Sequence, residues 1–150
     1  MSVKTSTNRF EYDAATAFAT IASPQTLTAS GASTNALPVD VLIAYWDSGD
    51  VASLLDMAVV IETSAVSGTA ASATFAVQVA PDSGAFSAPV AVGTAVAVTA
   101  TGRSVLIVDR SDVTNALAGS AVGSMRLYAT ITGTSPSFTF VAYPAPLTGL

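Results

Sequence analysis

Carboxylates are the main reactive groups of this chain. Its 150 residues include ten acidic and five basic side chains but neither histidine nor cysteine. Acid–base catalysis would therefore depend on carboxylates, and imidazole or thiolate metal ligands are excluded. The closest cluster is Asp47-Ser48-Gly49-Asp50, with Asp56 nearby.

Asp47 and Asp50 have two interpretations. Two carboxylates around a glycine can hold a calcium ion or act as a glycosidase pair. Alternatively, the segment is a hydrophilic turn after an apolar strand at residues 42–46. Specific calcium loops carry more alternating oxygen ligands than this one. We therefore predict no catalytic residue, no metal site and no cofactor, and we leave open whether Asp47 and Asp50 bind an ion.

Two further groups of residues have a possible binding role. In Asp109-Arg110-Ser111-Asp112, Arg110 can meet a carboxylate within the subunit or across an interface, which makes Arg110 an interface candidate. Ser111 is a possible cap for a short helix over residues 112–117. Tyr45 and Trp46 can form a platform for sugars, although a lone tryptophan after an apolar strand more often belongs to a core.

The charge distribution limits the partners. Net charge is −5, and the five basic residues are scattered along the chain. Nucleic-acid binding requires clustered basic side chains, so neither nucleic acid nor an anionic membrane surface is an expected partner. Charged residues make up 10% of the chain, against about 25% in typical soluble domains. A neutral surface of short side chains suits a protein packed against neighbours, and alanine-rich composition alone is the alternative explanation.

Alternation of apolar and polar residues is the dominant pattern, and it predicts β-strands. Residues 125–132 place Leu127 and Ile131 on one face, and residues 136–143 place Phe138 and Phe140 on one face. The intervening Gly133-Thr134-Ser135-Pro136 is typical of a turn. These two strands are therefore expected to form a hairpin.

About eight short strands are expected in the whole chain, and the others lie upstream of these two. Residues 73–80 alternate with Phe75 and Val77 facing together and stop at Pro81-Asp82-Ser83-Gly84, a turn sequence. The other strands are expected at residues 57–66, 86–92, 94–99 and 105–108. This spacing favours an all-β fold, a single-domain β-sandwich with a jelly roll as the preferred form.

The beginning of the chain has a different character. Residues 1–26 lack sustained alternation and are interpreted as an extended N-terminal arm, with the β-sandwich domain at residues 27–150. Phe10, Tyr12 and Phe18 are separated by even numbers, so in an extended chain they share one face. We expect residues 1–20 to lie across a neighbouring subunit with these three rings as anchors. A frayed terminus, or an arm folded back as an edge strand of its own sandwich, is the alternative.

Three segments carry a family resemblance. They are Leu27-Thr28-Ala29-Ser30-Gly31 leading to Val39-Asp40, residues 73–80 followed by an Asp-Ser turn and Phe86, and Met125-Arg126-Leu127-Tyr128 continuing to Thr134. Together they resemble small virion structural proteins of tailed bacteriophages, encoded beside the major capsid protein. The resemblance covers residues 27–150 and rests on strand patterns and turns.

The resemblance implies a capsid decoration, or cement, protein. Such a protein is made in the host cytoplasm and binds the outer surface of the head at joints between subunits of the major capsid protein. It implies a viral structural protein without enzymatic activity, self-associated as a homotrimer. A carbohydrate-binding or tail-associated β module of a virion is the alternative function.

Overall fold

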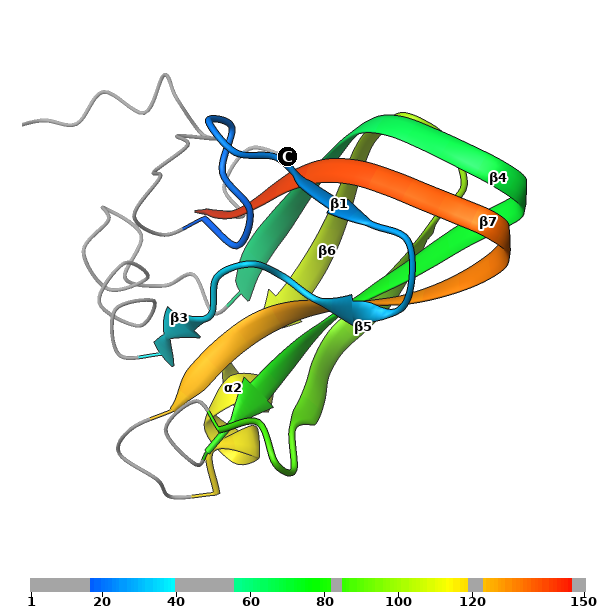
Figure 1. Ribbon diagram of the computed structural model, residues 1–150. Helices are drawn as coiled ribbons and strands as arrows, with labels where there is room; N and C mark the ends of the chain where they lie inside the picture. The colour runs from blue at the N-terminus through cyan, green and yellow to red at the C-terminus, as the bar shows by residue number, and fades with distance from the viewer. Residues whose placement is uncertain (1–16, 40–55, 82–84, 119–122, 147–150) are drawn as a thin grey trace, which may run out of the picture.

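The computed structural model describes residues 17–39, 56–81, 85–118 and 123–146 (Figure 1). Within these ranges the fold is all-β, as predicted: one sheet of seven antiparallel strands and one short helix. The elements are β1 (Gln25–Leu27), β2 (Gly31–Ala32), β3 (Leu37–Pro38), β4 (Asp56–Ala80), β5 (Val90–Val98), β6 (Gly102–Asp109), α2 (Arg110–Ala116) and β7 (Ser124–Pro146).

Two long strands form the centre of the sheet. β4 and β7 pair antiparallel from Met57 opposite Pro146 to Ala80 opposite Ser124. The hairpin predicted at residues 133–136 is therefore wrong, because both halves of β7 pair with β4 instead of with each other. For the same reason, the strands expected at residues 57–66 and 73–80 are two parts of one strand.

A bend divides both long strands in the middle. Their pairing register shifts between Thr63 and Ser72, as in β-bulges, which bend and twist a strand. Gly133 has φ +116°, and a Cβ atom there would lie 2.8 Å from the Cα atom of Ala71. Ser135 also has positive φ. The residues that suggested a turn in the sequence therefore build this bend.

The outer strands follow the same bend on either side. β5 pairs with residues 73–79 of β4 and β6 pairs with residues 56–63, so the two strands run in succession along one edge of β4. β5 is one strand rather than the two expected around Gly93, which it includes at φ +73°. β1, β2 and β3 pair in succession along the far edge of β7.

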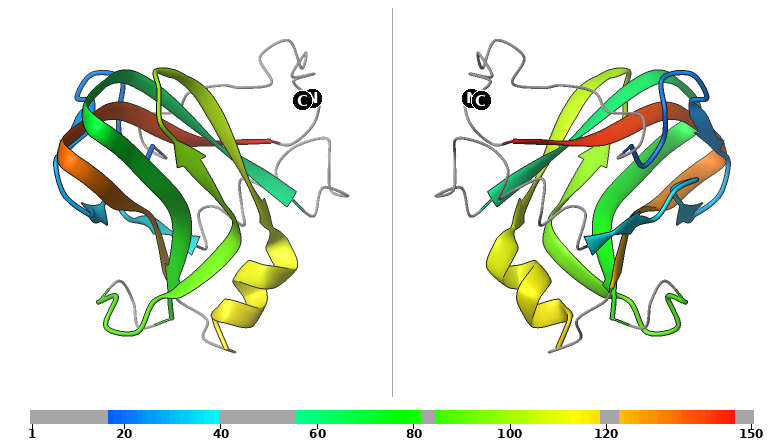
Figure 2. Two further views of the ribbon diagram at one scale, coloured as in Figure 1. Left: turned by 90° about the vertical axis from the view of Figure 1, so that its right-hand side faces the viewer. Right: turned by 90° about the vertical axis from the view of Figure 1, so that its left-hand side faces the viewer.

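The result is a sheet folded across its middle, so that its two halves face each other (Figures 1 and 2). We call them the first half (β6, residues 56–63 of β4, residues 138–146 of β7 and β1) and the second half (β5, residues 73–80 of β4, residues 124–132 of β7, β2 and β3). This arrangement is sandwich-like. α2 lies at one end of the two layers (Figure 2) and contributes Val113 to the core.

The core lies between the two halves. Phe75 of the second half meets Phe140 of the first, with ring centroids 4.9 Å apart and an edge-to-face angle of 70°. The inward positions predicted from alternation are confirmed: Phe75, Val77, Leu127, Phe138 and Phe140 are buried, and Ile131 packs partly buried against them. The apolar face of each long strand is thus buried on both sides of the bend.

The short helix begins earlier than expected. α2 starts at Arg110, and its N-cap is Asp109, whose carboxylate accepts a hydrogen bond of 2.7 Å from the backbone N–H of Ser111. The prediction of Ser111 as the cap is therefore wrong. Asp109 ends β6 in an extended conformation, the backbone geometry that an N-cap requires.

The end of the predicted arm belongs to the domain itself. Phe18 is fully buried in the core, and its backbone N–H donates to the carbonyl of Ala142 at 2.9 Å. Phe18 as an anchor on a neighbouring subunit is therefore wrong, because no part of its ring reaches the surface. β1 also crosses the boundary expected between residues 26 and 27. Phe10 and Tyr12 lie outside the described residues.

Candidate functional site

Apart from Phe18, Arg110 is the one predicted interface candidate that lies within the described residues. Arg110 is the first residue of α2 and is partly buried. Asp47, Asp50, Tyr45 and Trp46 lie outside the described residues. Within residues 17–39, 56–81, 85–118 and 123–146, no group of three or more acidic, histidine or cysteine side chains is placed to hold a metal ion. No helix in these ranges is both long and apolar enough to span a membrane.

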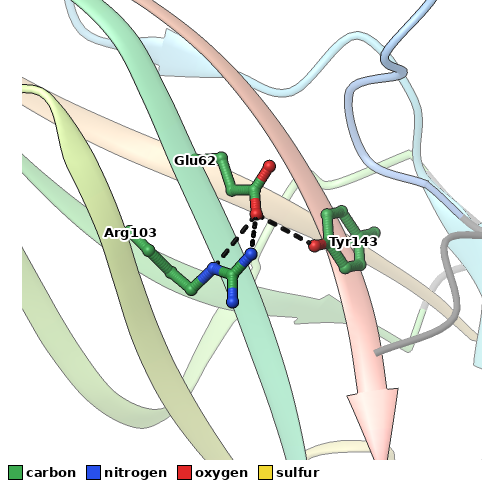
Figure 3. A network of polar contacts seen from close by, with 3 residues as sticks. All are labelled: Glu62, Arg103 and Tyr143. Atoms are coloured by element: carbon green, nitrogen blue, oxygen red, sulfur yellow. Dashed lines mark hydrogen bonds and ion pairs between the residues drawn. The ribbon is translucent and has the colours of Figure 1, made fainter. Parts of the chain in front are cut away.

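A polar network lies on the outer face of the first half (Figure 3). Glu62 of β4 is flanked by Arg103 of β6 and Tyr143 of β7, because these residues occupy outward positions on three adjacent strands. Glu62 Oε1 accepts hydrogen bonds from Arg103 Nε at 3.0 Å, from Arg103 Nη2, and from the Tyr143 hydroxyl at 3.3 Å. One carboxylate oxygen thus joins three strands.

The electrostatics of this network stabilise its present protonation states. The hydrogen bond from Arg103 to Glu62, with the attraction between their charges, raises the pKa of the guanidinium. Burial, and secondarily the negative charge of Glu62, raises the pKa of the Tyr143 phenol. Arg103 therefore stays charged and Tyr143 stays neutral near neutral pH, and the network ties three strands together.

An open hollow of about 600 Å³ adjoins the network. Ile21, Pro24 and Val141 supply apolar wall, and Glu62 and Arg103 supply an ion pair. Thr63 also lines this hollow, and its hydroxyl oxygen is buried without a hydrogen-bond partner among the described residues. The hollow can accept an apolar group beside a polar one, but its charges already satisfy each other.

A second polar cluster lies on the outer face of the second half. Arg126 of β7 donates from Nε to the side-chain oxygen of Gln78 on β4 at 2.9 Å. Its guanidinium carbon lies 4.2 Å from the ring centroid of Phe86 and 5.5 Å from that of Tyr128. These distances are within the range of cation–π attraction. We call these four residues the Arg126 stack.

Phe86 of the Arg126 stack has an unusual backbone. Its φ is +49°, in the left-handed region that non-glycine residues rarely adopt. Such a conformation costs about 1–3 kcal/mol and persists where surrounding contacts hold it. The contact with Arg126 is one such contact. The alternation in the sequence puts Arg126 and Tyr128 on one face of a strand. The contact with Phe86, which lies in the β4–β5 connection, could not be inferred from spacing.

Small neutral side chains cover the bend. From Ser64 to Ala70 on β4 and from Thr132 to Ser135 on β7, the exposed residues are all serine, threonine, alanine or glycine. The same holds for Thr99–Thr101 between β5 and β6. A hollow of about 660 Å³ at this place is lined by Val66, Ser67, Gly68, Ala70, Ala71, Ser72, Thr99, Ala100 and Thr101. This uncharged area is called the bend surface.

Comparison with protein-family models, with curated proteins and with solved structures found no match to this chain.

Proposed function

We propose that this chain is a capsid decoration protein of a tailed bacteriophage, a non-enzymatic component that binds the outside of the head. Its partners are the major capsid protein, at joints between capsid subunits, and further copies of itself in a homotrimer. A jelly roll is the finer fold assignment within the all-β architecture. The sequence resemblance of residues 27–150 supports this proposal.

The bend surface is the observation that carries the proposal. Its exposed side chains are short and uncharged over three neighbouring segments, residues 64–70, 99–101 and 132–135. Covering such side chains loses little rotamer entropy, and charged residues are depleted at the centres of stable interfaces. A surface of this kind favours close packing against another protein.

Binding at a joint explains how such a protein stabilises a shell. The complete site exists only where assembled subunits meet, so the decoration protein binds the assembled state and not the separated subunits. Binding to one state of an equilibrium stabilises that state by mass action. The head is therefore expected to resist disruption more strongly as more of its joints are occupied.

The proposal is tested with heads assembled without this chain. Purified protein is added, and the heads are sedimented and then heated. We expect saturable co-sedimentation and a higher temperature of head disruption. A matched variant, Thr69→Glu, places a charge on the exposed bend surface and is expected to weaken co-sedimentation. Absence of the wild-type protein from sedimented heads contradicts the proposal.

A carbohydrate-binding or tail-associated role is the second candidate, and the Arg126 stack favours it. Phe86 and Tyr128 present aromatic rings on an outer sheet face beside Gln78, a combination able to stack on a sugar and bond its hydroxyls. Retention on surface polysaccharides of the host, lost in Tyr128→Ala, supports this second candidate.

A further inference from the structure

The two arginines on the outer faces of the sheet differ in how their charges are satisfied. Arg103 forms an ion pair with the carboxylate of Glu62. Arg126 contacts Gln78, Phe86 and Tyr128, and no carboxylate in the described residues is paired with it. The amide of Gln78 is neutral, so the charge of Arg126 remains uncompensated there. A cation held in this way fits an incoming carboxylate.

Arg126 is also held ready for such a partner. One hydrogen bond and two ring contacts fix its guanidinium, so binding loses less side-chain entropy than it would for a mobile arginine. The guanidinium fork matches the two oxygens of a carboxylate. Arginine and aromatic residues are also the types that contribute most to binding at interface centres.

The chain itself carries a fitting carboxylate. Asp112 is exposed in the first turn of α2, and its side chain accepts no hydrogen bond within the described residues. Arg126 and Asp112 belong to different surfaces, the outer face of the second half and the end helix. Contact between two different surfaces of identical subunits is heterologous, and such contacts form closed rings when the rotation between subunits allows it.

We propose that the Arg126 stack binds Asp112 of a second copy of this chain. Charge complementarity identifies the occupant: the chain has a net charge of −5, so copies repel each other except where a cation meets a carboxylate. This contact deepens the proposed function, on whose self-association it rests, by naming the residues that join the subunits.

A double-mutant cycle in solution tests the contact. The oligomer dissociation constant is measured by analytical ultracentrifugation for wild type, Arg126→Gln, Asp112→Asn and the double variant. We expect each single change to weaken association roughly tenfold or more. The double variant is expected to be no weaker than either single variant, because both remove the same pair.

Thr130→Glu is the matched control. It changes net charge by the same amount as Arg126→Gln, on an exposed outward position of the same strand about 13 Å away. We expect it to leave association within about threefold of wild type. The charge exchange Arg126→Glu with Asp112→Arg, at unchanged net charge, is expected to restore association that Arg126→Glu alone abolishes.

Three results of the association measurements overturn the proposal. They are a wild type that stays monomeric at all concentrations, an Arg126→Gln variant that associates as well as Thr130→Glu, and single losses that add independently in the double variant. Polysaccharide binding that Arg126→Gln removes while the mass stays unchanged assigns the stack to carbohydrate and also overturns it. Head binding is measured separately, so a chain that associates through this contact but does not bind heads contradicts only the proposed function.

Discussion

The two halves of the folded sheet share the long strands β4 and β7, but the polar residues on their outer faces are satisfied differently. In the first half, Val60 and Tyr143 are buried on the outer face, and Arg103 is neutralised by Glu62. In the second half, Arg126 contacts two aromatic rings, and among the described residues its hydrogen-bond partner is a neutral amide. Charge on the outer face of the first half is thus satisfied within the subunit, whereas the outer face of the second half is where we propose contact with a second copy.

The largest expected effect comes from the core that the two halves share. Phe138→Ala in the first half and Phe75→Ala in the second should each lower the free energy of unfolding by ~3–5 kcal/mol, because both rings are fully buried. Urea denaturation followed by circular dichroism measures this loss. A loss below about 1 kcal/mol for either variant would show that the halves do not share a close-packed core.

The bend between the halves is the next most sensitive place. Gly133→Ala should destabilise the fold by more than Gly102→Ala, although both glycines have positive φ. A Cβ atom at Gly133 meets backbone atoms at 2.8–2.9 Å, whereas at Gly102 nothing lies within 4 Å. Each change adds about 1–3 kcal/mol of backbone strain, and the excess at Gly133 measures the steric contribution. Equal losses of stability for the two variants in thermal denaturation would contradict a steric contribution at Gly133.

Tyr143 should make the first half sensitive to alkaline pH. Its pKa is raised above the ordinary value of 10.0, first by burial and then by Glu62. A raised pKa favours the protonated native state, so this contribution is fully present below about pH 10 and is lost as pH rises through the folded pKa. The free energy of unfolding should therefore fall as the pH rises above about 10, less steeply in Tyr143→Phe. Identical slopes in the two proteins would contradict the assignment.

The smallest effect separates the two arginines directly. Glu62→Gln should change the free energy of unfolding by only about 0–1 kcal/mol, because the ion pair is partly exposed. It should leave self-association unchanged, unlike Arg126→Gln. Parallel measurements of stability and of oligomer mass check both points. Weakened association in Glu62→Gln would end the distinction between the two outer faces.

Alternation of side chains predicted the inward faces of the long strands correctly, because burial of Phe75 or Phe138 depends on local periodicity. The continuity of β7 through Gly133 and Pro136 could not be predicted, since the same residues suit a turn or a bend, and the choice depends on pairing with distant β4. Phe18 is separated from Phe10 and Tyr12 by even numbers of residues, which predicts a shared face. Spacing alone does not show whether that face meets a neighbouring subunit or the chain's own core.

The Arg126 stack was not predicted, because Phe86 reaches Arg126 from the connection between β4 and β5, which is distant in the sequence.

Reconstruction of the virus head by electron cryomicroscopy tests the central claim most directly. The account predicts copies of the folded sheet outside the shell, above positions where subunits of the major capsid protein meet, with the bend surface covered by protein. Particles in which this chain is confined to the tail or the interior, or is missing from the head, would contradict it.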